Sequence, residues 1–542
     1  MPVMLRAGVP PPASRARPAP GDLVAALKDP ACYPHPVGAV EVLETHISWV
    51  LLAGDFAYKV KKPVRLGFLD FSALASRRFY CEEELRLNRR TAPGLYLGVV
   101  PITGKPPHVR IGGSGPAVEY AVRMQRFPQG DVLAQRALEG AIGNAEADGI
   151  AVAMARFHAD LPPAAAGCAF GSPQTVITAM LENFGDIAML DATAPVREAI
   201  AELQGWARTQ HPLLRAVFAR RKREGFVREC HGDLHLGNIV LHDGKAVFFD
   251  ALEFSDRLRW TDVMNDVAFT AMDLLEHELP RLAARFVDRY LAESGDYGGL
   301  AVLRYYMVYR ALVRAKVAAI RARQSPGRGP RTSSPRAECL AYLQLARRLA
   351  RPLPRLLVLM HGLSCSGKTM VSQRLLEALA AVRIRTDVER KRLRGLAAWE
   401  RLRARPGEGA YDAGEIAAVY AHVARLATAC IEAGHPAIVD ATFLRRAQRD
   451  EFIALARAAG ASVAIVECAC PPDILRARAS LRARDNPDAS DAGIDVLEFQ
   501  LAHVEPLAAE ERLHAARVDT SHPGEWQATV ESLARRLRVK VP

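Results

Sequence analysis

Apolar positions follow a strand-like alternation in the first part of the chain and a helical spacing in the part after it. Residues 40–62 alternate between apolar and polar and are interrupted at Gly54-Asp55, which predicts antiparallel strands, and residues 119–127 predict another strand. Helices are predicted over residues 77–90, 147–158 and 196–206. The chain from residue 128 to residue 228 is therefore predicted to be mainly helical.

The last third of the chain alternates predicted strands with predicted helices, as a parallel, doubly wound sheet requires. The strands are predicted at residues 355–360, 381–386, 437–439 and 518–520. Before them, residues 324–335, QSPGRGPRTSSP, have the composition of a flexible segment. Residues 338–351 predict one more helix that is able to pack on the preceding domain, so the domain boundary is predicted near Arg351-Pro352.

The composition indicates a large protein with more than one core. The chain has 542 residues, and half of them are apolar. A net charge of +12 suits a polyanionic partner, but no recognisable DNA- or RNA-binding module accompanies it, so a nucleic-acid partner is not favoured. Nine cysteines without a repeated spacing indicate reduced thiols in a cytoplasmic protein. No apolar run reaches the length of a membrane span, and residues 1–35 are predicted to be a disordered tail.

A hairpin is predicted in HGDLHLGNIVLHDGKAVFFD, which begins at His231. Its two short apolar runs flank an Asp-Gly step, which favours a tight turn. The open end of the hairpin is expected to bring Asn238 and Asp250 together, with Asp233 on the loop before them. The side-chain carbonyl oxygen of Asn238 and the carboxylate of Asp250 suit Mg2+. Asp233 is then expected to orient or deprotonate a hydroxyl. Two alternatives stay open: an ordinary polar turn, and a metal site formed by His231 and His235 with Asp233.

A phosphate-binding loop follows the predicted strand at residues 355–360. Its pattern, Gly362-x4-Gly367-Lys368-Thr369, stands between a strand and a helix, as such a loop requires. Backbone amides are expected to surround the phosphates, Lys368 to reach the terminal ones and the Thr369 hydroxyl to bind Mg2+. The predicted nucleotide site comprises Gly362, Leu363, Ser364, Cys365, Ser366, Gly367, Lys368 and Thr369.

The pattern His231-x-Asp233-x4-Asn238, followed by Asp250, resembles the catalytic loop of aminoglycoside phosphotransferases and, more distantly, of protein kinases. The resemblance implies that Asp233 is the catalytic base and that Asn238 and Asp250 bind the metal. Little room remains after Asp250 for the long segment on which peptide kinases bind their substrates, so a small-molecule acceptor is expected. An acidic residue that braces the catalytic loop is also implied. Asp266 is the first candidate and Asp262 the second, and a helix-surface role is the alternative.

The same resemblance implies a phosphate-binding lysine on an early strand. Phe56-Ala57-Tyr58-Lys59 has the required spacing, and Lys61, on the same face of the strand, is the alternative. Glu84 or Glu83 on the following helix is the implied partner of this lysine. The lysines also suit a solvated strand edge, and the acids a solvated helix face. No G-x-G-x-x-G pattern stands between the first two strands, so the phosphate-covering loop is expected to be shorter or different.

The carboxyl-terminal region resembles the P-loop kinases that include zeta toxins, gluconate kinase, chloramphenicol phosphotransferase and the kinase half of polynucleotide kinase. The resemblance implies that Asp387 receives the acceptor hydroxyl and that Arg390 steadies it or the incoming phosphate. Asp440 ends its strand at the edge of the sheet where ligands bind. The segment RARASLRARDNPDASD resembles an arginine-bearing lid, which implies that Arg478 and Arg484 bind nucleotide. Surface charge is the alternative for these arginines.

The order of these parts resembles a bacterial fusion of two domains. Residues 36–351 are expected to form a bilobal, aminoglycoside-phosphotransferase-like α+β domain, and residues 352–542 a P-loop kinase or ATPase domain with a parallel doubly wound α/β sheet. The implied function is an ATP- and Mg2+-dependent phosphotransferase with two nucleotide sites and a small hydroxylated acceptor. Two alternatives remain: the P-loop domain regulates the first domain, or it phosphorylates the 5′-hydroxyl end of a polynucleotide. Neither the acceptors nor the oligomeric state follows from the sequence.

Overall fold

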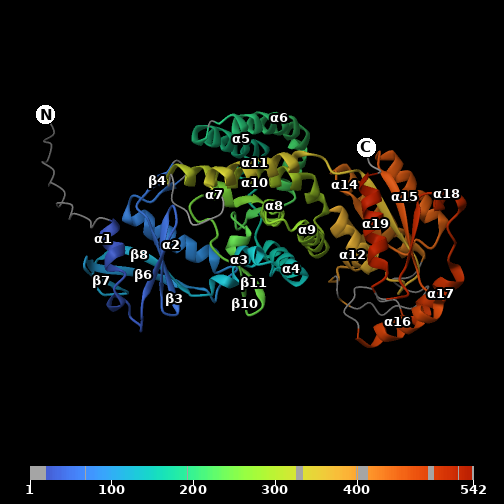
Figure 1. The fold of residues 1–542 in the computed structure, drawn as a ribbon, viewed down its shortest axis with the longest axis horizontal. Helices are drawn as coiled ribbons and strands as arrows, with labels where there is room; N and C mark the ends of the chain where they lie inside the picture. Colours follow the sequence, from blue (N-terminus) through green and yellow to red (C-terminus); the bar gives the residue numbers. More distant parts are fainter. Residues whose placement is uncertain are drawn as a thin grey trace, which may run out of the picture. The chain divides into compact units, whose positions relative to one another are not determined.

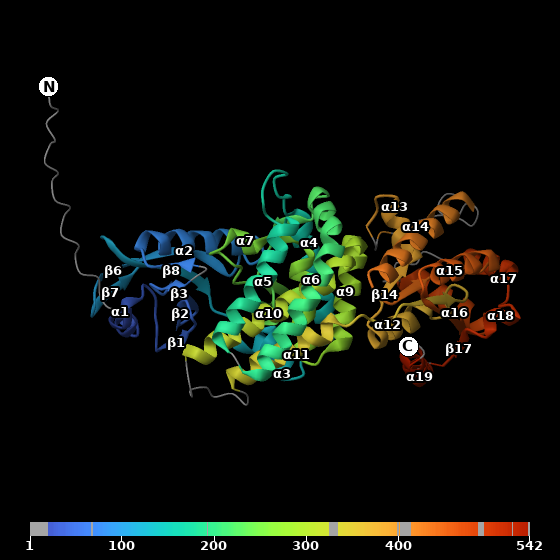
Figure 2. The same ribbon diagram turned by 90° about the horizontal axis from the view of Figure 1, so that it is seen from above.

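The computed structural model describes residues 20–66, 69–191, 193–324, 334–397, 400, 413–485, 493–522 and 524–539. The chain forms two compact units. The first comprises the chain up to Gln129 together with Phe248–Asp256, and the second comprises Gly130–Val247 and Arg257–Pro542. Figures 1 and 2 show the ribbon in two views. None of the described helices is long and apolar enough to cross a lipid bilayer.

A six-stranded antiparallel sheet forms the first unit, in the order β1-β2-β3-β8-β6-β7. Its strands are β1 Val40–Glu44, β2 Ser48–Ala53, β3 Phe56–Lys61, β6 Tyr96–Lys105, β7 His108–Ile111 and β8 Ala117–Gln125. The helix α2, Leu74–Asn88, packs on β6 and β8. The predicted strands and helix are confirmed. The turn between β1 and β2 spans only residues 45–47, in agreement with the expected short loop.

The predicted disordered tail is wrong for residues 20–35. They contain the helix α1, Pro20–Ala26, and the short 3-10 helix Pro30–Cys32. The prolines stand in the first turns, where a missing N–H costs no helical hydrogen bond. Apolar side chains of this segment are buried in the core of the sheet: Leu23, Leu27, Cys32 and Tyr33. Residues 1–19 of the predicted tail lie outside the described residues.

The amino-terminal part of the second unit is mainly helical, as predicted. Its helices are α3 Leu133–Leu138, α4 Asn144–Asp160, α5 Pro173–Leu190, α6 Ala194–Arg223, α7 Asp256–Arg259, α8 Met264–Glu276, α9 Pro280–Ser294, α10 Leu300–Gln324 and α11 Pro335–Ala350. The strands β9, Val227–Glu229, and β12, Trp260–Asp262, pair with each other. Helix α11 packs on α10, where Arg314 Nε donates to Tyr342 Oη at 3.2 Å.

The predicted hairpin is present. The strands β10, Ile239–His242, and β11, Lys245–Phe248, form a two-stranded sheet. The turn between them places Asp243 at a φ of 50° and Gly244 at a φ of 71°. Positive φ at both central residues is the geometry that an Asp-Gly step favours in a two-residue hairpin turn. The Asp-Gly step thus stands at the turn, as predicted, and its two residue types account for the turn's geometry.

Five parallel strands form the sheet of the carboxyl-terminal part, in the order β14-β15-β13-β16-β17. They are β13 Leu356–His361, β14 Val382–Arg385, β15 Ala437–Asp440, β16 Ser462–Ala469 and β17 Ala515–Asp519. The accompanying helices are α12 Lys368–Leu379, α13 Thr386–Leu393, α14 Ala413–Glu432, α15 Arg446–Ala458, α16 Pro472–Asp485, α17 Ile494–His503, α18 Ala509–Arg512 and α19 Trp526–Val539. Figure 1 shows α12, α14, α15 and α19 around the sheet.

The continuous apolar run along β13 explains why helices pack against both faces of this sheet. Leu356, Val358 and Met360 are buried in one core with side chains of α12 and α19. Leu357 and Leu359 are fully buried as well, and successive side chains of a strand point to opposite faces. Both faces of the strand are thus apolar, as a sheet covered on both sides requires. The predicted parallel, doubly wound sheet is confirmed.

Candidate active site

The strand β3 carries Lys59 and Lys61 on one face, and α2 brings Glu84 against both. One Glu84 carboxylate oxygen lies 2.8 Å from Lys59 Nζ and the other lies 2.7 Å from Lys61 Nζ. None of the three side chains is more than 10% exposed, and β3 lies between two other strands, so the lysines are not solvated edge charges. Glu83 pairs instead with Arg86 at 2.8 Å. The structure therefore pairs Glu84 with Lys59.

The buried charges in this cluster stabilise one another. Burial alone would raise the pKa of Glu84, but the charges of Lys59 and Lys61 lower this pKa to about 2. Burial alone would lower the pKa of Lys59, but the charges of Asp250, Glu84 and Glu253 raise it well above its ordinary value. Lys59 is therefore a permanent cation at neutral pH, which is the property that a phosphate-binding lysine requires.

The segment that follows the hairpin brings two more carboxylates to the lysines. Asp250 contacts Lys59, and Glu253 contacts Lys61. Asp250 has a φ of 62°, in the left-handed region that residues other than glycine rarely adopt, and its backbone N–H donates to Tyr96 Oη at 3.0 Å. The Asp250 side chain is 42% exposed, whereas that of Glu253 is 4% exposed. Asp250 is thus the carboxylate of this pair that a ligand can reach.

The loop before the hairpin belongs to the second unit and carries Asp233 and Asn238. The side-chain amide of Asn238 donates to the backbone oxygen of Asp233 at 2.9 Å and to Asp233 Oδ2 at 3.1 Å. These bonds use the amide nitrogen, so the carbonyl oxygen is the Asn238 atom that remains for a cation. The predicted convergence of both residues with Asp250 stays a prediction, because Asp250 belongs to the first unit.

Asp266 on α8 braces the catalytic loop. Its carboxylate oxygens accept the backbone N–H groups of His231 at 2.8 Å and Gly232 at 3.0 Å, and the residue is fully buried. Burial alone would raise its pKa. His158, whose Nε2 lies 3.6 Å from Asp266 Oδ2, lowers the pKa to about 2 together with the charges of His231 and Arg310. Asp266 therefore has the bracing position that the resemblance implied and not a place on the helix surface.

The alternative metal site at His231 and His235 finds no support in the geometry. Nδ1 of His235 accepts the backbone N–H of Gly237 at 3.0 Å, within its own turn. Among the described residues, two groups of three side chains have possible metal-ligand atoms within 4.8 Å of one another. Neither group contains His231 or His235. We therefore infer that these histidines stabilise the conformation of the loop and do not bind a metal.

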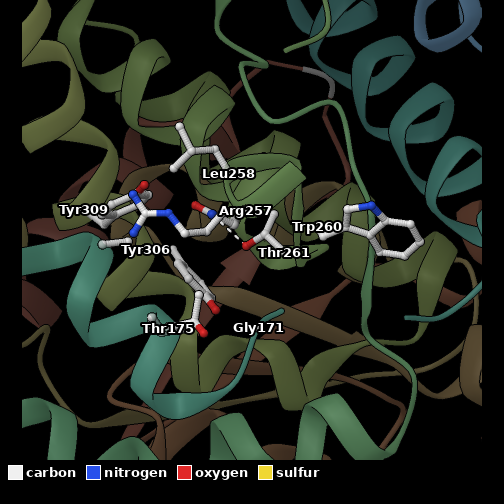
Figure 3. A pocket seen from close by; sticks show the side chains of 11 residues that line it. Gly171, Thr175, Arg257, Leu258, Trp260, Thr261, Tyr306 and Tyr309 are labelled. Atoms are coloured by element: carbon white, nitrogen blue, oxygen red, sulfur yellow. Dashed lines mark hydrogen bonds between the residues drawn. The ribbon is translucent and has the colours of Figure 1, made fainter. Parts of the chain in front are cut away.

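A pocket in the second unit lies between α5, α10 and the chain around β12 (Figure 3). It is lined by Gly171, Thr175, Val176, Ala179, Arg257, Leu258, Trp260, Thr261, Asn265, Tyr306 and Tyr309. In its wall, Asn265 donates to Thr261 Oγ1 at 2.9 Å and accepts a hydrogen bond from Arg310 Nε at 2.8 Å. Arg310 also donates to the backbone oxygen of Gly232 at 2.9 Å. Two hydrogen bonds thus connect the pocket to the residue before Asp233.

The phosphate-binding loop connects β13 to α12. Gly362 has a φ of 144°, and a Cβ atom there would lie 2.6 Å from the backbone oxygen of Cys468, so only glycine fits. Gly367 has a φ of 81° at the start of α12. Lys368 Nζ donates to the backbone oxygen of Leu363 at 2.7 Å across the loop. This contact closes the loop on its own residues.

The residues of this loop fit phosphate and a hard cation. Ser366 Oγ is buried and has no hydrogen-bond partner among the described residues. A phosphate oxygen in the loop would accept a hydrogen bond from this hydroxyl. Thr369 stands in the first turn of α12. Asp440, at the end of β15, accepts a hydrogen bond from Ser372 Oγ at 3.1 Å. Hydroxyl and carboxylate oxygens near a phosphate loop are ligands that suit Mg2+.

The other predicted residues of this domain are placed as follows. Asp387 lies in the first turn of α13, one residue after the helix begins, and pairs with Arg390 at 2.8 Å. The guanidinium group of Arg478 on α16 donates to the backbone oxygen of Cys365 in the loop at 3.3 Å. Arg478 is therefore a loop contact and not surface charge alone. The side chain of Arg484 lies outside the described residues.

Two residues at these sites were not predicted. Gln500 on α17 accepts the backbone N–H of Ser364 in the phosphate loop at 2.7 Å and is 7% exposed. Glu253 pairs with Lys61. No motif contains Gln500, and only its distance of three residues from Asp250 marks Glu253 in the sequence. Long-range packing places both.

The uncharacterised protein Rv2004c of Mycobacterium tuberculosis is 31% identical to this chain over 468 residues, which cover 85% of this chain and 91% of that protein. This chain belongs to the same family as Rv2004c. In this chain, a model described as "Phosphotransferase enzyme family" matches residues 113–305, and a model described as "AAA domain" matches residues 357–507. The predicted fusion of a phosphotransferase-like domain with a P-loop domain is confirmed.

Solved structures are also similar to parts of this chain. A choline/ethanolamine kinase family protein from Mesorhizobium loti has a TM-score of 0.35 at 13% identity, covering 57% of this chain and 93% of that chain. A sugar kinase from Janibacter sp. HTCC2649 has a TM-score of 0.25 at 19% identity, covering 35% of this chain and 95% of that chain. The family models support a nucleotide-dependent phosphotransferase.

Proposed function

We propose that the chain is an ATP- and Mg2+-dependent phosphotransferase with two nucleotide sites, which transfers the γ-phosphate to a hydroxyl of a small molecule. The observation that carries the proposal is the buried ion pair of Lys59 with Glu84, beside the accessible carboxylate of Asp250. Kinase-type enzymes need a fixed lysine–glutamate pair next to a metal-binding aspartate to bind nucleotide phosphates. The family models support the same reaction class.

At the first site, Lys59 binds phosphate oxygens, and Asn238 and Asp250 are the proposed ligands of the metal. When bound, Mg2+ neutralises negative charge on the phosphates. Asp233 is the proposed base. Its side chain is 35% exposed, and the hydrogen bond from Asn238 orients its carboxylate, the group proposed to accept the proton of the acceptor hydroxyl.

At the second site, Lys368 and the amides around Ser366 bind the phosphates, and Thr369 is the proposed protein ligand of the metal. Asp387 is the proposed base or hydrogen-bond anchor of a second acceptor, with Arg390 3 residues further along α13 to bind the transferring phosphate. Arg478 adds positive charge at the loop, where negative charge develops during transfer. The buried Ser366 hydroxyl in the phosphate loop, which has no hydrogen-bond partner in the described part of the chain, supports this assignment.

The pocket of Figure 3 supports a small acceptor for the first site. Aromatic and polar side chains line it together, a combination that suits a compact hydroxylated molecule with an apolar face. Its wall is connected to the catalytic loop through Asn265 and Arg310. A long peptide would need an extended surface beside the transferring phosphate, and the few residues between Asp250 and α7 offer little length for one.

The proposal is tested with labelled ATP and the full-length protein, offered a pool of small alcohols and sugars and, separately, a 5′-hydroxyl oligonucleotide. We expect label in a small molecule. Asp233→Asn should lower transfer to the first-site acceptor by about a hundredfold while nucleotide binding is retained. Labelling of the oligonucleotide alone, or full transfer by Asp233→Asn, would contradict the proposal.

A further inference from the structure

The strand β14 is an edge of the five-stranded sheet, and helix α9 of the preceding domain packs on it. Figures 1 and 2 both show α9 beside α12. At this edge, Oδ1 of Asp288 on α9 accepts the backbone N–H of Arg383 on β14 at 2.7 Å. An edge strand has backbone N–H groups without strand partners, and a carboxylate of the other domain binds one of them here.

Arg383 extends this contact from the edge of the sheet towards the phosphate loop. Its Nη2 lies 3.3 Å from Asp288 Oδ2 and donates to Gln373 Oε1 at 2.8 Å. Its Nη1 donates to the backbone oxygen of Thr369 and to Ser372 Oγ, both at 3.2 Å. Arg383 is 9% exposed, and Asp288, its carboxylate partner at this contact, belongs to the other domain.

Ser372 completes the connection to the phosphate site. It is fully buried and accepts a hydrogen bond from Arg383, and its Oγ lies 3.1 Å from Asp440 Oδ2 and 3.1 Å from the backbone oxygen of Thr369, the two acceptors of its one proton. Asp440 is the last residue of β15, and Ser372 lies three residues after Thr369 on α12. Three consecutive contacts therefore link Asp288 in the phosphotransferase-family domain to a carboxylate at the P-loop site.

We propose that Asp288 is a positioning residue of the P-loop site, which completes the cation-binding side of that site from the neighbouring domain. Through Arg383 and Ser372 it fixes the turn that carries Thr369 and the carboxylate of Asp440. This inference rests on the proposed function, because the cation concerned is the Mg2+ of the bound nucleotide. Removal of such an outer contact typically lowers metal affinity by about 10- to 100-fold.

The test measures how nucleotide binding by the full-length protein depends on Mg2+, with a non-hydrolysable ATP analogue as the probe. The binding that Lys368→Ala removes is assigned to the P-loop site. Asp288→Asn should raise the Mg2+ concentration for half-maximal binding at this site by about tenfold. Binding without Mg2+ should change by less than about twofold, whereas a merely structural loss would weaken binding under both conditions.

Arg304→Met is the matched control. Arg304 on α10 also reaches across to the P-loop domain, where its Nη2 donates to the backbone oxygen of Gly434 at 2.8 Å. Gly434 precedes β15, so this contact lies at the end of the strand opposite Asp440. Arg304→Met should leave the Mg2+ requirement within about twofold of the parent. An unchanged requirement in Asp288→Asn, or an equal rise in Arg304→Met, would overturn the proposal.

If Asp288→Asn does not fold, Ser372→Ala tests the positioning role instead, because it removes only one buried hydroxyl from the contacts that link Asp288 to Asp440. It should raise the Mg2+ requirement by a similar factor of about ten, and an unchanged requirement would overturn the positioning role. If Lys368→Ala removes no nucleotide binding, the proposed function of the P-loop domain fails and the inference fails with it. If Lys368→Ala removes binding while Asp288→Asn and Ser372→Ala keep the parent requirement, the positioning role alone fails.

Discussion

The carboxylate of Glu84 lies 2.8 Å from the ammonium group of Lys59, and the Glu84 side chain is fully buried. Its neighbour Glu83 is an equally acidic residue on the same helix, but it points to Arg86 on the outer side. Adjacent residues on a helix are about 100° apart around its axis, so only one of the two acids is able to face β3. The pair offers a matched comparison of a buried and a surface carboxylate.

Glu84→Gln should destabilise the first unit by about 3 kcal/mol, because it leaves two buried lysines with fewer counter-charges. It should also lower kcat/KM for ATP at the first site by about tenfold or more, measured with Lys368→Ala present to silence the second site. Glu83→Gln should cost less than about 1 kcal/mol and leave the kinetics unchanged. Equal effects of the two substitutions would contradict the assignment of Glu84.

Lys368→Ala and Asp387→Asn should separate binding from transfer at the P-loop site. Lys368→Ala should abolish nucleotide binding there, because it removes the ammonium group that reaches the terminal phosphates. Asp387→Asn should retain binding and lower transfer by about a hundredfold if the carboxylate is a general base. Nucleotide titration and transfer rates of both variants provide the measurement, and full transfer by Asp387→Asn would remove Asp387 from the mechanism.

Trp260→Ala should weaken binding of the first-site acceptor. Trp260 lines the pocket of Figure 3 and stacks on Phe170, with ring centroids 6.0 Å apart. Loss of the ring should raise KM for the acceptor by about tenfold and leave KM for ATP within about twofold. Trp206→Ala is the control, because Trp206 stacks on Tyr305 outside the pocket lining. A rise in KM for ATP alone would show that the pocket is not an acceptor site.

The stability of the second unit should fall in acid through Asp266. Its pKa is lowered from 3.8 to about 2 in the folded chain, so the ionised carboxylate stabilises the fold above about pH 4. This contribution, roughly 2 kcal/mol, is lost as the pH falls towards 2. Urea unfolding between pH 6 and pH 3 should show this slope in the parent and a flatter one in Asp266→Asn. Parallel curves for the two proteins would contradict the effect.

The sequence predicts best the features that short, local patterns encode. The phosphate loop, the Asp-Gly hairpin and the strand that ends at Lys61 all depend on residues within a few positions of one another. The hairpin turn is an example: Asp243 and Gly244 adopt the positive φ values that their residue types favour. Those parts of the fold follow from local conformational preference and apolar periodicity.

The residues that the sequence leaves undecided depend on distant packing. The choice between Glu83 and Glu84 requires the rotation of α2 relative to the sheet, which no local pattern gives. Asp288 and Arg383 are 95 positions apart, and nothing near either residue marks the other as a partner. The composition of residues 20–35 suggests disorder, yet a few apolar side chains find a core formed by strands further along the chain.

The packing of helix α9 on the edge strand β14 also bears on how the protein is synthesised. Helix α9 precedes β14 in the chain, so a ribosome synthesises the helix before the strand on which it packs. Domains generally fold in order as they emerge, and an uncovered edge strand is a site at which separate nascent chains pair wrongly. Here Asp288 is ready to accept the N–H of Arg383 when that strand appears. A gene rearranged so that the P-loop domain is translated first should therefore yield more aggregated protein.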